Sequence, residues 1–221
     1  MTTLTSAPVA PLLARLFAEA AAQSPATDPA FAAILPEERE RLMRSRADYR
    51  MLYTELKDYA LPVSPDTGRL LYLLARAVRA RAIVEFGTSF GLSTLHLAAA
   101  LRDNGGGRLV TSEFEPSKVA RASANLAAGG LADLVDIRVG DALETLASDL
   151  PETVDLLLLD GAKSLYRDVL LLVEPRLRPG AVIVADNADY CPEHVAHVGA
   201  VANGYISLPF TDEVMLSVRL G

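Results

Sequence analysis

The sequence predicts an α/β fold whose mostly parallel sheet ends in an antiparallel hairpin. From residue 82 onward, short strand-like runs alternate with helical stretches, which is the pattern of a parallel sheet covered by helices. The run Leu156–Leu159 has no polar alternation and therefore indicates a strand buried on both faces. Near the end of the chain, Tyr205–Pro209 and Val214–Arg219 follow each other without a crossover helix, so they are predicted to form the hairpin.

The first 80 residues are predicted to be helical. Leu12, Leu13, Leu16 and Phe17 recur at helical spacing, and Pro25 and Pro29 mark a loop after them. A second helix is expected from about Glu37 to Tyr59 and a third from Asp66 to Val78, because Pro62 and Pro65 separate them. The second helix carries an apolar stripe of Leu42, Met43, Tyr49, Leu52, Tyr53 and Leu56, which we interpret as core or dimer packing rather than ligand contacts. In the third helix, Leu70, Leu71, Leu73 and Leu74 are expected to be buried.

The remaining residues are expected to supply five parallel strands and the helices between them. The strands are Ile83–Phe86, Leu109–Glu113, Val135–Val139, Val154–Asp160 and Ala181–Ala185. The helices are Leu92–Leu101, Pro116–Ala128, Ala142–Ser148 and Leu165–Leu177. We therefore divide one compact domain into a helical segment, residues 1–80, and a ligand-binding α/β part, residues 81–221.

Composition narrows the class of protein. The chain has 221 residues, 51% of them hydrophobic, and a net charge of −7, which disfavours nucleic acid as a partner. The single cysteine, Cys191, excludes a disulfide framework and suits a reducing compartment. Residues Thr2–Ser6 lack the basic start of a secretory signal, and no apolar run is long enough to span a bilayer. We expect a soluble cytoplasmic protein without a membrane partner.

A glycine-containing turn follows the first predicted strand. Gly87 and Gly91 permit a tight turn and a close approach of ligand to backbone, and a helix start follows with Ser93 as a further donor. Glu113 lies 22 residues beyond Gly91, where a carboxylate could hold the ribose of NAD or of S-adenosylmethionine. The alternative is that the glycines serve only a strand–helix turn.

Each main strand also ends in, or just before, an acidic residue. These residues are Glu85, Glu113, Asp141, Asp160 and Asp186. Because parallel strands place their carboxyl ends at one edge of the sheet, the acids should converge there, and something cationic or hydrogen-bonding must lie among them.

Asp160, Asp186 and Asn187 carry hard oxygen ligands of the kind that Mg²⁺ binds. The alternative for Asp186 and Asn187 is turn chemistry before Pro192. Lys163 follows Asp160 by three residues; near a cation and partly buried, its pKa could fall far enough for it to act as a base. A solvated lysine at a helix start is the alternative.

Taken together, these segments resemble the catechol and caffeoyl-CoA O-methyltransferase family. The resemblance covers roughly residues 60–221 and rests on the order and spacing of several motifs. The motifs are Glu85–Ser93, Glu113, Gly140–Ala142, Leu159–Lys163 with Tyr166, Leu177–Gly180 and Ala185–Asn187. It implies a Rossmann-like class I methyltransferase fold with a seven-stranded sheet, and N-terminal helices that cover the cofactor and contribute to a homodimer.

The resemblance also implies roles for individual residues. S-adenosylmethionine would be bound by Val63, Glu85, Gly87, Ser89, Gly91, Ser93, Glu113, Phe114, Asp141, Ala142 and Asp160. Asp160, Asp186 and Asn187 would bind Mg²⁺ (or Mn²⁺ or Ca²⁺), with Asp160 and Lys163 as catalytic residues and Lys163, Asn187 and Tyr190 at the substrate. The implied reaction is metal-assisted methyl transfer to a hydroxyl of a small acceptor, most simply a catechol-like aromatic.

Departures from the family pattern and rival functions remain open at this point. Gly161 and Ala162 are smaller than the residues usual in relatives, which predicts an open wall beside the metal. His194 and His197, with Cys191 and Glu193, form a weak soft-metal pattern. The rival functions are a metal-independent methyltransferase, an NAD(P)-dependent oxidoreductase and a non-catalytic cofactor-binding protein.

Overall fold

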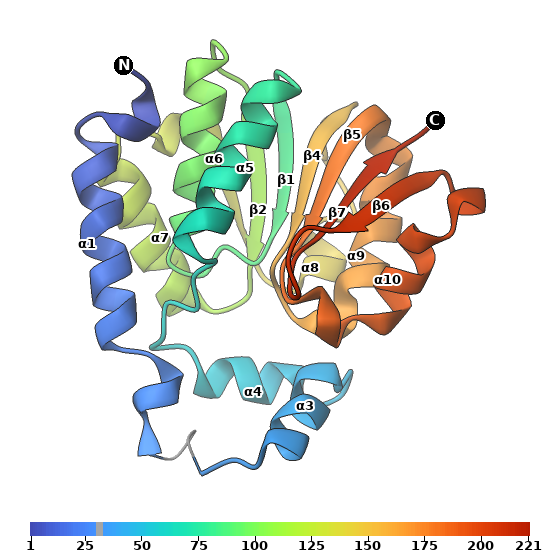
Figure 1. Cartoon of the computed structure of the whole chain (residues 1–221). Helices are drawn as coiled ribbons and strands as arrows, with labels where there is room; N and C mark the ends of the chain where they lie inside the picture. Colours follow the sequence, from blue (N-terminus) through green and yellow to red (C-terminus); the bar gives the residue numbers. More distant parts are fainter. Residues whose placement is uncertain (30–32) are drawn as a thin grey trace.

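The computed structural model describes residues 1–29 and 33–221, and its centre is a seven-stranded sheet with helices on both faces (Figure 1). The strand order is β3-β2-β1-β4-β5-β7-β6, with β1 to β5 parallel and β7 antiparallel to both β5 and β6. The strands are β1 Ala82–Phe86, β2 Arg108–Glu113, β3 Val135–Val139, β4 Val154–Leu159, β5 Leu177–Ala185, β6 Tyr205–Pro209 and β7 Met215–Arg219. The predicted parallel sheet and terminal hairpin are confirmed.

The α-helices flank the sheet or lie at one end of it. They are α1 Val9–Ala22, α3 Pro36–Arg44, α4 Tyr49–Glu55, α5 Pro65–Ala77, α6 Leu92–Asp103, α7 Pro116–Ala128, α8 Ala142–Thr145, α9 Tyr166–Val173 and α10 Pro192–Gly199. Figure 1 shows α1, α5, α6 and α7 beside one half of the sheet, α9 and α10 beside the other, and α3 and α4 below the strand ends. Among the described residues, no helix is both long and apolar enough to cross a membrane.

Strand β4 explains why the core has two sides. Leu156 and Leu158 belong to the apolar cluster that includes residues of α1, α5 and α6, whereas Leu157 and Leu159 belong to the cluster against α9. All four side chains are fully buried, as expected for a strand whose alternate side chains point to opposite covered faces. The uninterrupted leucine run therefore follows from the position of β4 in the middle of the sheet.

The predicted helix from Glu37 to Tyr59 is wrong as one continuous element. The chain leaves helical geometry at Ser45, which is extended, and re-enters it at Tyr49. The Ser45 hydroxyl accepts hydrogen bonds from the backbone N–H groups of Ala47 and Asp48, so the side chain competes with helical bonding at this point. As a result, α3 and α4 are two short helices.

Three smaller expectations also need correction. Leu73 is 62% exposed rather than buried, and Leu70 and Leu74 are only partly buried. The helix expected to continue to Leu177 leaves α-helical geometry after Val173, because Pro175 has no N–H for helical bonding. Strand β5 therefore begins at Leu177, four residues earlier than expected.

The turn after β1 brings two strand ends into contact. Gly87 has φ +102°, and a Cβ atom there would lie 2.5 Å from the carbonyl oxygen of Asp160, at the end of β4. Only glycine accepts both the backbone angle and this approach. The turn consequently lies directly against the segment that follows β4.

We predict that Leu158→Ala lowers the free energy of unfolding by about 2–5 kcal/mol, because it leaves a cavity in a fully buried strand. Urea denaturation followed by circular dichroism measures this change. Leu73→Ala, at an exposed helix position, is the matched control and should change stability by less than about 1 kcal/mol. Equal losses in the two variants would contradict the assignment of the core.

Candidate active site

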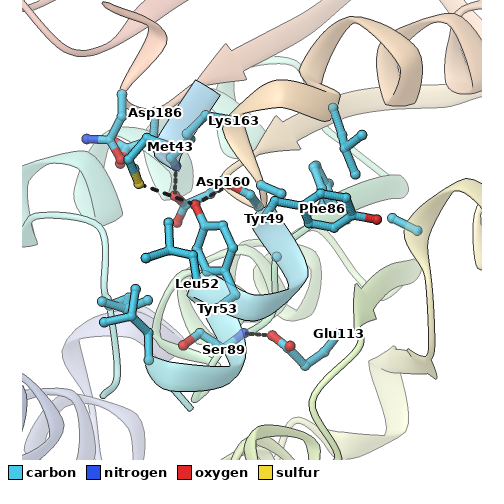
Figure 2. A pocket seen from close by; sticks show the side chains of 18 of the residues that line it. Met43, Tyr49, Leu52, Tyr53, Phe86, Ser89, Glu113, Asp160, Lys163 and Asp186 are labelled. Carbon is cyan, nitrogen blue, oxygen red and sulfur yellow. Dashed lines mark hydrogen bonds and ion pairs between the residues drawn. The ribbon is translucent and has the colours of Figure 1, made fainter. Parts of the chain in front are cut away.

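A cavity of about 1080 Å³ lies at the carboxyl ends of the parallel strands and is covered by α3 and α4 (Figure 2). Ten of the predicted site residues line it: Gly87, Ser89, Glu113, Phe114, Asp141, Ala142, Asp160, Lys163, Asp186 and Asn187. They come from the segments that follow β1, β2, β3, β4 and β5. The convergence inferred from the acidic strand ends is therefore present for Glu113, Asp141, Asp160 and Asp186.

Glu113 ends β2 with its carboxylate held by the backbone. One carboxylate oxygen accepts a hydrogen bond from the N–H of Ser89 at 2.8 Å, and the other accepts from the N–H of Glu115 at 3.0 Å. The side chain is 7% exposed and lines the cavity (Figure 2). Each carboxylate oxygen keeps a further lone pair, so Glu113 can accept hydrogen bonds from a vicinal diol such as a ribose.

A buried network joins Lys163 to the segment after β5. The ammonium of Lys163 donates to Asp160 Oδ1 at 3.1 Å and to the hydroxyl of Tyr166 at 2.7 Å. That hydroxyl in turn donates to the carbonyl oxygen of Asp186 at 2.8 Å. The Tyr166 ring is held by edge contacts with Phe86 and His194. Lys163 is 5% exposed, so it is not a solvated lysine at a helix start.

The expected lowering of the Lys163 pKa was tied to a nearby divalent cation and stays a prediction. Burial lowers the pKa of Lys163, but attraction by Asp160, Tyr53 and Asp186 outweighs burial, so these protein groups raise the pKa overall. The protein neighbours of Lys163 therefore favour its ammonium form. As an ammonium ion, Lys163 can donate an N–H hydrogen bond to a ligand oxygen and offset the negative charge of that oxygen.

Asp160 and Asp186 are the two carboxyl groups whose charge acts on Lys163. Burial raises the pKa of Asp160, and burial together with repulsion from Asp160 raises that of Asp186. A further cation between the two carboxyl groups would lower the pKa values of both. With Asn187, which adopts a left-handed backbone (φ 50°) directly after Asp186, the donor set fits a hard divalent ion. Turn geometry and ligand chemistry are thus compatible at Asn187.

The helices α3 and α4 form the opposite wall of the cavity. The side chains that the sequence assigned to core or dimer packing line the cavity: Leu42, Met43, Tyr49, Leu52, Tyr53 and Leu56. Leu52 and Leu56 are also buried, and Tyr49 and Tyr53 pack against the core, so the core part of the prediction holds for these four. In Figure 2 the phenol of Tyr53 points towards Asp160 and Lys163; its hydroxyl donates to the carbonyl of Gly161 at 3.4 Å and contacts the sulfur of Met43 at 3.9 Å. This stripe could not be assigned from spacing, since a ligand-facing stripe and a core-facing stripe share the helical period.

Charged pairs hold these helices over the strand ends. Arg50 contacts Asp141 by a hydrogen-bonded ion pair, and Arg46 pairs with Asp168 of α9 at 2.5 Å. Asp141 also accepts from the N–H of Leu143 and so caps α8. The carboxylate of Asp141 therefore serves as a helix cap and as part of the cavity wall at once.

Five predicted site residues do not line the cavity: Val63, Glu85, Gly91, Ser93 and Tyr190. Glu85 is fully buried and accepts hydrogen bonds from the hydroxyls of Ser93 and Thr94, at 2.6 and 2.7 Å. These two hydrogen bonds connect β1 to the start of α6, outside the cavity lining. Contacts of these five residues with a ligand stay predictions.

The expected open wall at Gly161 is wrong. A Cβ atom at Gly161 would lie 2.4 Å from the ring of Phe86, so the aromatic side chain fills the space that a larger residue would need. His194 and His197 do not line the cavity. Among residues 1–29 and 33–221, no group of three or more His, Cys, Asp or Glu side chains could hold a metal ion, so the soft-metal pattern forms no such cluster.

The sequence did not assign a role to two residues at or beside the cavity, Lys118 and Tyr166. Lys118 lines the cavity and is 4% exposed, although a lysine in the first turn of a helix is ordinarily solvated. Tyr166 was noted as part of a motif without a role, and its hydrogen bonds now explain its position. No spacing in the sequence distinguishes either residue from a common surface or core residue.

The comparison with protein families agrees with this geometry. Residues 84–188 match a family described as a methyltransferase domain. Over 131 residues the chain is 39% identical to a catechol O-methyltransferase from Niastella koreensis, an alignment that spans 58% of each protein. The chain is thus similar to methyltransferases over residues 84–188 and to a catechol O-methyltransferase over 58% of its length. It spans a little under three fifths of the length of the curated relatives it matches first.

Two solved structures extend the match beyond residues 84–188. The cofactor-bound protein Rv0187 from MTB has a TM-score of 0.70 and 26% identity, covering 98% of this chain and 93% of that one. The O-methyltransferase TomG from Streptomyces achromogenes, which is involved in tomaymycin synthesis, was solved in complex with SAM. It has a TM-score of 0.64 and 28% identity, covering 86% of this chain and 93% of that one.

We predict that the Glu85→Gln variant gains stability relative to the wild type as pH rises. Burial, opposed by the Ser93 and Thr94 hydrogen bonds, raises the pKa of Glu85 from 4.5 to about 7. The folded wild type therefore binds the proton more tightly than the unfolded chain, and it loses stability between pH 4.5 and 7. Glutamine has no charge to bury, so this loss is absent.

Urea denaturation at pH 5 and pH 8 tests this linkage. The difference in unfolding free energy between variant and wild type should move in favour of the variant by about 1–3 kcal/mol from pH 5 to pH 8. Glu19→Gln, at an exposed carboxylate, is the control and should show the same difference at both pH values. A pH-independent difference for Glu85→Gln would refute the raised pKa.

Proposed function

We propose that this chain transfers a methyl group from S-adenosylmethionine to a hydroxyl of a small, ring-bearing acceptor, with a divalent cation bound at Asp160, Asp186 and Asn187. The observation that carries the proposal is the convergence of Glu113, Asp160, Lys163 and Asp186 on one cavity at the strand ends. A diol-binding carboxylate, an ammonium and a metal-type donor set together suit this reaction better than any one of them alone.

The cofactor is assigned to the side of the cavity formed by the turn after β1 and the end of β2. Glu113 would accept the two ribose hydroxyls, and Asp141 with Ala142 would flank the adenine. The close packing of Gly87 on Asp160 supports this placement, because it sets the turn beside the reacting end of the site. The structural relative TomG was solved with SAM, which agrees with this assignment.

The acceptor is assigned to the space between the strand ends and α3–α4. Leu42, Met43 and Leu52 offer an apolar surface to one side of it, and Lys163 with the two aspartates offers charge to the other. An aromatic ring with adjacent hydroxyls matches both surfaces. The 39% identity to a catechol O-methyltransferase supports the same acceptor class.

The chain's own residues contribute mainly position and charge. A divalent cation, when bound, would lower the pKa of the acceptor hydroxyl. With the cation bound, Lys163 would accept the proton of the acceptor hydroxyl, and its ammonium would then stabilise the oxygen anion, since Asp160 and Tyr166 hold the Lys163 nitrogen in one place. The apolar side chains of α3 and α4 would exclude water from the methyl acceptor. No covalent enzyme intermediate is required.

The metal-independent alternative differs from this proposal in one respect. It assigns the burial of Asp160 and Asp186 to structure alone, with Lys163 as the sole counter-charge. What supports the metal-dependent form is the donor set, because the amide of Asn187 lies beside the two carboxyl groups in the lining of the cavity.

We predict that Glu113→Gln weakens the binding of S-adenosylhomocysteine about 10- to 100-fold. The variant loses the charge of a carboxylate that would accept two ribose hydroxyls. Isothermal titration calorimetry measures the dissociation constant. Glu115→Gln is the control, because Glu115 caps α7 through Ser117 and should leave affinity within about twofold of the wild type. Unchanged affinity in Glu113→Gln would remove Glu113 from the cofactor site.

We predict that catechol binds the complex with S-adenosylhomocysteine only when Mg²⁺ is present, and that Asp186→Ala abolishes this binding. The reason is that Asp186 would be a ligand of the ion that contacts the acceptor. Calorimetry with Mg²⁺ and then with EDTA measures both effects.

Asp189→Ala is the matched control, since Asp189 is an exposed acid three residues away and should leave catechol binding intact. Catechol binding that is indifferent to EDTA and to Asp186 would establish the metal-independent alternative. Failure of S-adenosylhomocysteine itself to bind would remove the methyltransferase proposal.

A further inference from the structure

Lys118 is a buried cation in the wall of the active-site cavity. It lies in the first turn of α7, is 4% exposed, and shares the cavity lining with Ser89, Glu113 and Phe114. Its ammonium donates one long hydrogen bond, 3.3 Å, to the hydroxyl of Ser89. An ammonium has three donors, and in the part of the chain that the structure describes the other two have no protein acceptor.

The charges around Lys118 attract it without pairing with it. No carboxylate within residues 1–29 and 33–221 forms a salt bridge with it, and Glu113 already accepts two backbone N–H groups. Beneath the ammonium lies the ring of Phe90, with its centroid 5.9 Å away. Burial lowers the pKa of Lys118, and electrostatic attraction by Glu113 and Asp160 opposes this lowering. The charge of Lys118 therefore interacts with both carboxyl groups. The cation therefore acts on the interior of the cavity.

This position matters because the two forms of the cofactor differ in charge. S-adenosylmethionine carries a positive sulfonium, and S-adenosylhomocysteine has a neutral sulfur at the same place. A fixed positive charge in the wall repels the first and leaves the second nearly unaffected. The repulsion is stronger in a cavity closed by α3 and α4 than it would be in water, since the effective dielectric constant is lower there.

We infer that Lys118 is a specificity-determining residue that biases the cofactor site towards the neutral thioether product and against the sulfonium cofactor. The inference rests on the proposed function, because it assumes that S-adenosylmethionine occupies this cavity.

The test is calorimetric titration of S-adenosylmethionine and of S-adenosylhomocysteine, each alone, into the full chain. Lys118→Met removes the charge and keeps the length of the side chain, and Lys118→Arg keeps the charge. Arg121→Met is the matched control: Arg121 lies one turn further along α7 over the same Phe90 ring, but it lies outside the active-site cavity.

In Lys118→Met, the ratio of the two dissociation constants, cofactor over product, should fall about three- to tenfold relative to the wild type. Lys118→Arg and Arg121→Met should keep the wild-type ratio. If Lys118→Met does not fold, as judged by its thermal transition, Lys118→Gln replaces it. An unchanged ratio in a folded, neutral variant that binds both ligands overturns the inference and leaves the proposed function standing. Failure of the wild type to bind either ligand overturns the proposed function itself.

Discussion

The active-site arrangement depends on the contact between Gly87 and the backbone of Asp160. These residues follow β1 and β4, which are neighbours in the sheet although more than 70 positions separate them in the sequence. Because a side chain at Gly87 would collide with the Asp160 carbonyl, the two loops can pack together only with glycine at this point. The contact places the turn of β1, and with it Ser89 and Glu113, next to Asp160 and Lys163. Without it the cofactor side and the acceptor side of the cavity would not share one space.

Charge balance is the second organising feature of the site. Lys163 pairs with Asp160 and, through Tyr166, with the backbone of Asp186, so one buried ammonium is shared by two acidic segments. Lys118 lines the same cavity beside Ser89, and among the residues that the structure describes it has no carboxylate partner. The site therefore contains a paired cation beside the proposed acceptor position and an unpaired cation beside the proposed cofactor position. This asymmetry links the proposed chemistry, in which Lys163 stabilises an oxygen anion, to the proposed preference for a neutral cofactor product.

In the N-terminal segment, the sequence predicts helices but not the surface that their apolar side chains face. Helical spacing found an apolar stripe between Leu42 and Leu56, and the structure does contain helices there. The periodicity cannot say which surface the stripe faces, and the stripe lines the cavity while Leu52 and Leu56 are also buried. The break at Ser45 was also missed, because it depends on a local hydrogen bond from the backbone N–H of Asp48 to the Ser45 hydroxyl, which competes with helical bonding. The sequence also gave no sign that Lys118 is buried. Its burial results from packing against Phe90 and Ser89, which are distant along the chain.

The sequence by itself determined the class of fold, the five parallel strands with their terminal hairpin, and the acidic residues at the strand ends. These follow from local periodicity and from the rule that parallel strands share one carboxyl edge, so they need no knowledge of distant contacts. Only the tertiary structure decided which acids enter the cavity. Glu113 and Asp186 do, whereas Glu85 turns back to the hydroxyls of Ser93 and Thr94. It also decided how the protein groups act on Lys163, because the shift of its pKa depends on burial and on the charges of Asp160 and Asp186, which only the folded chain brings together.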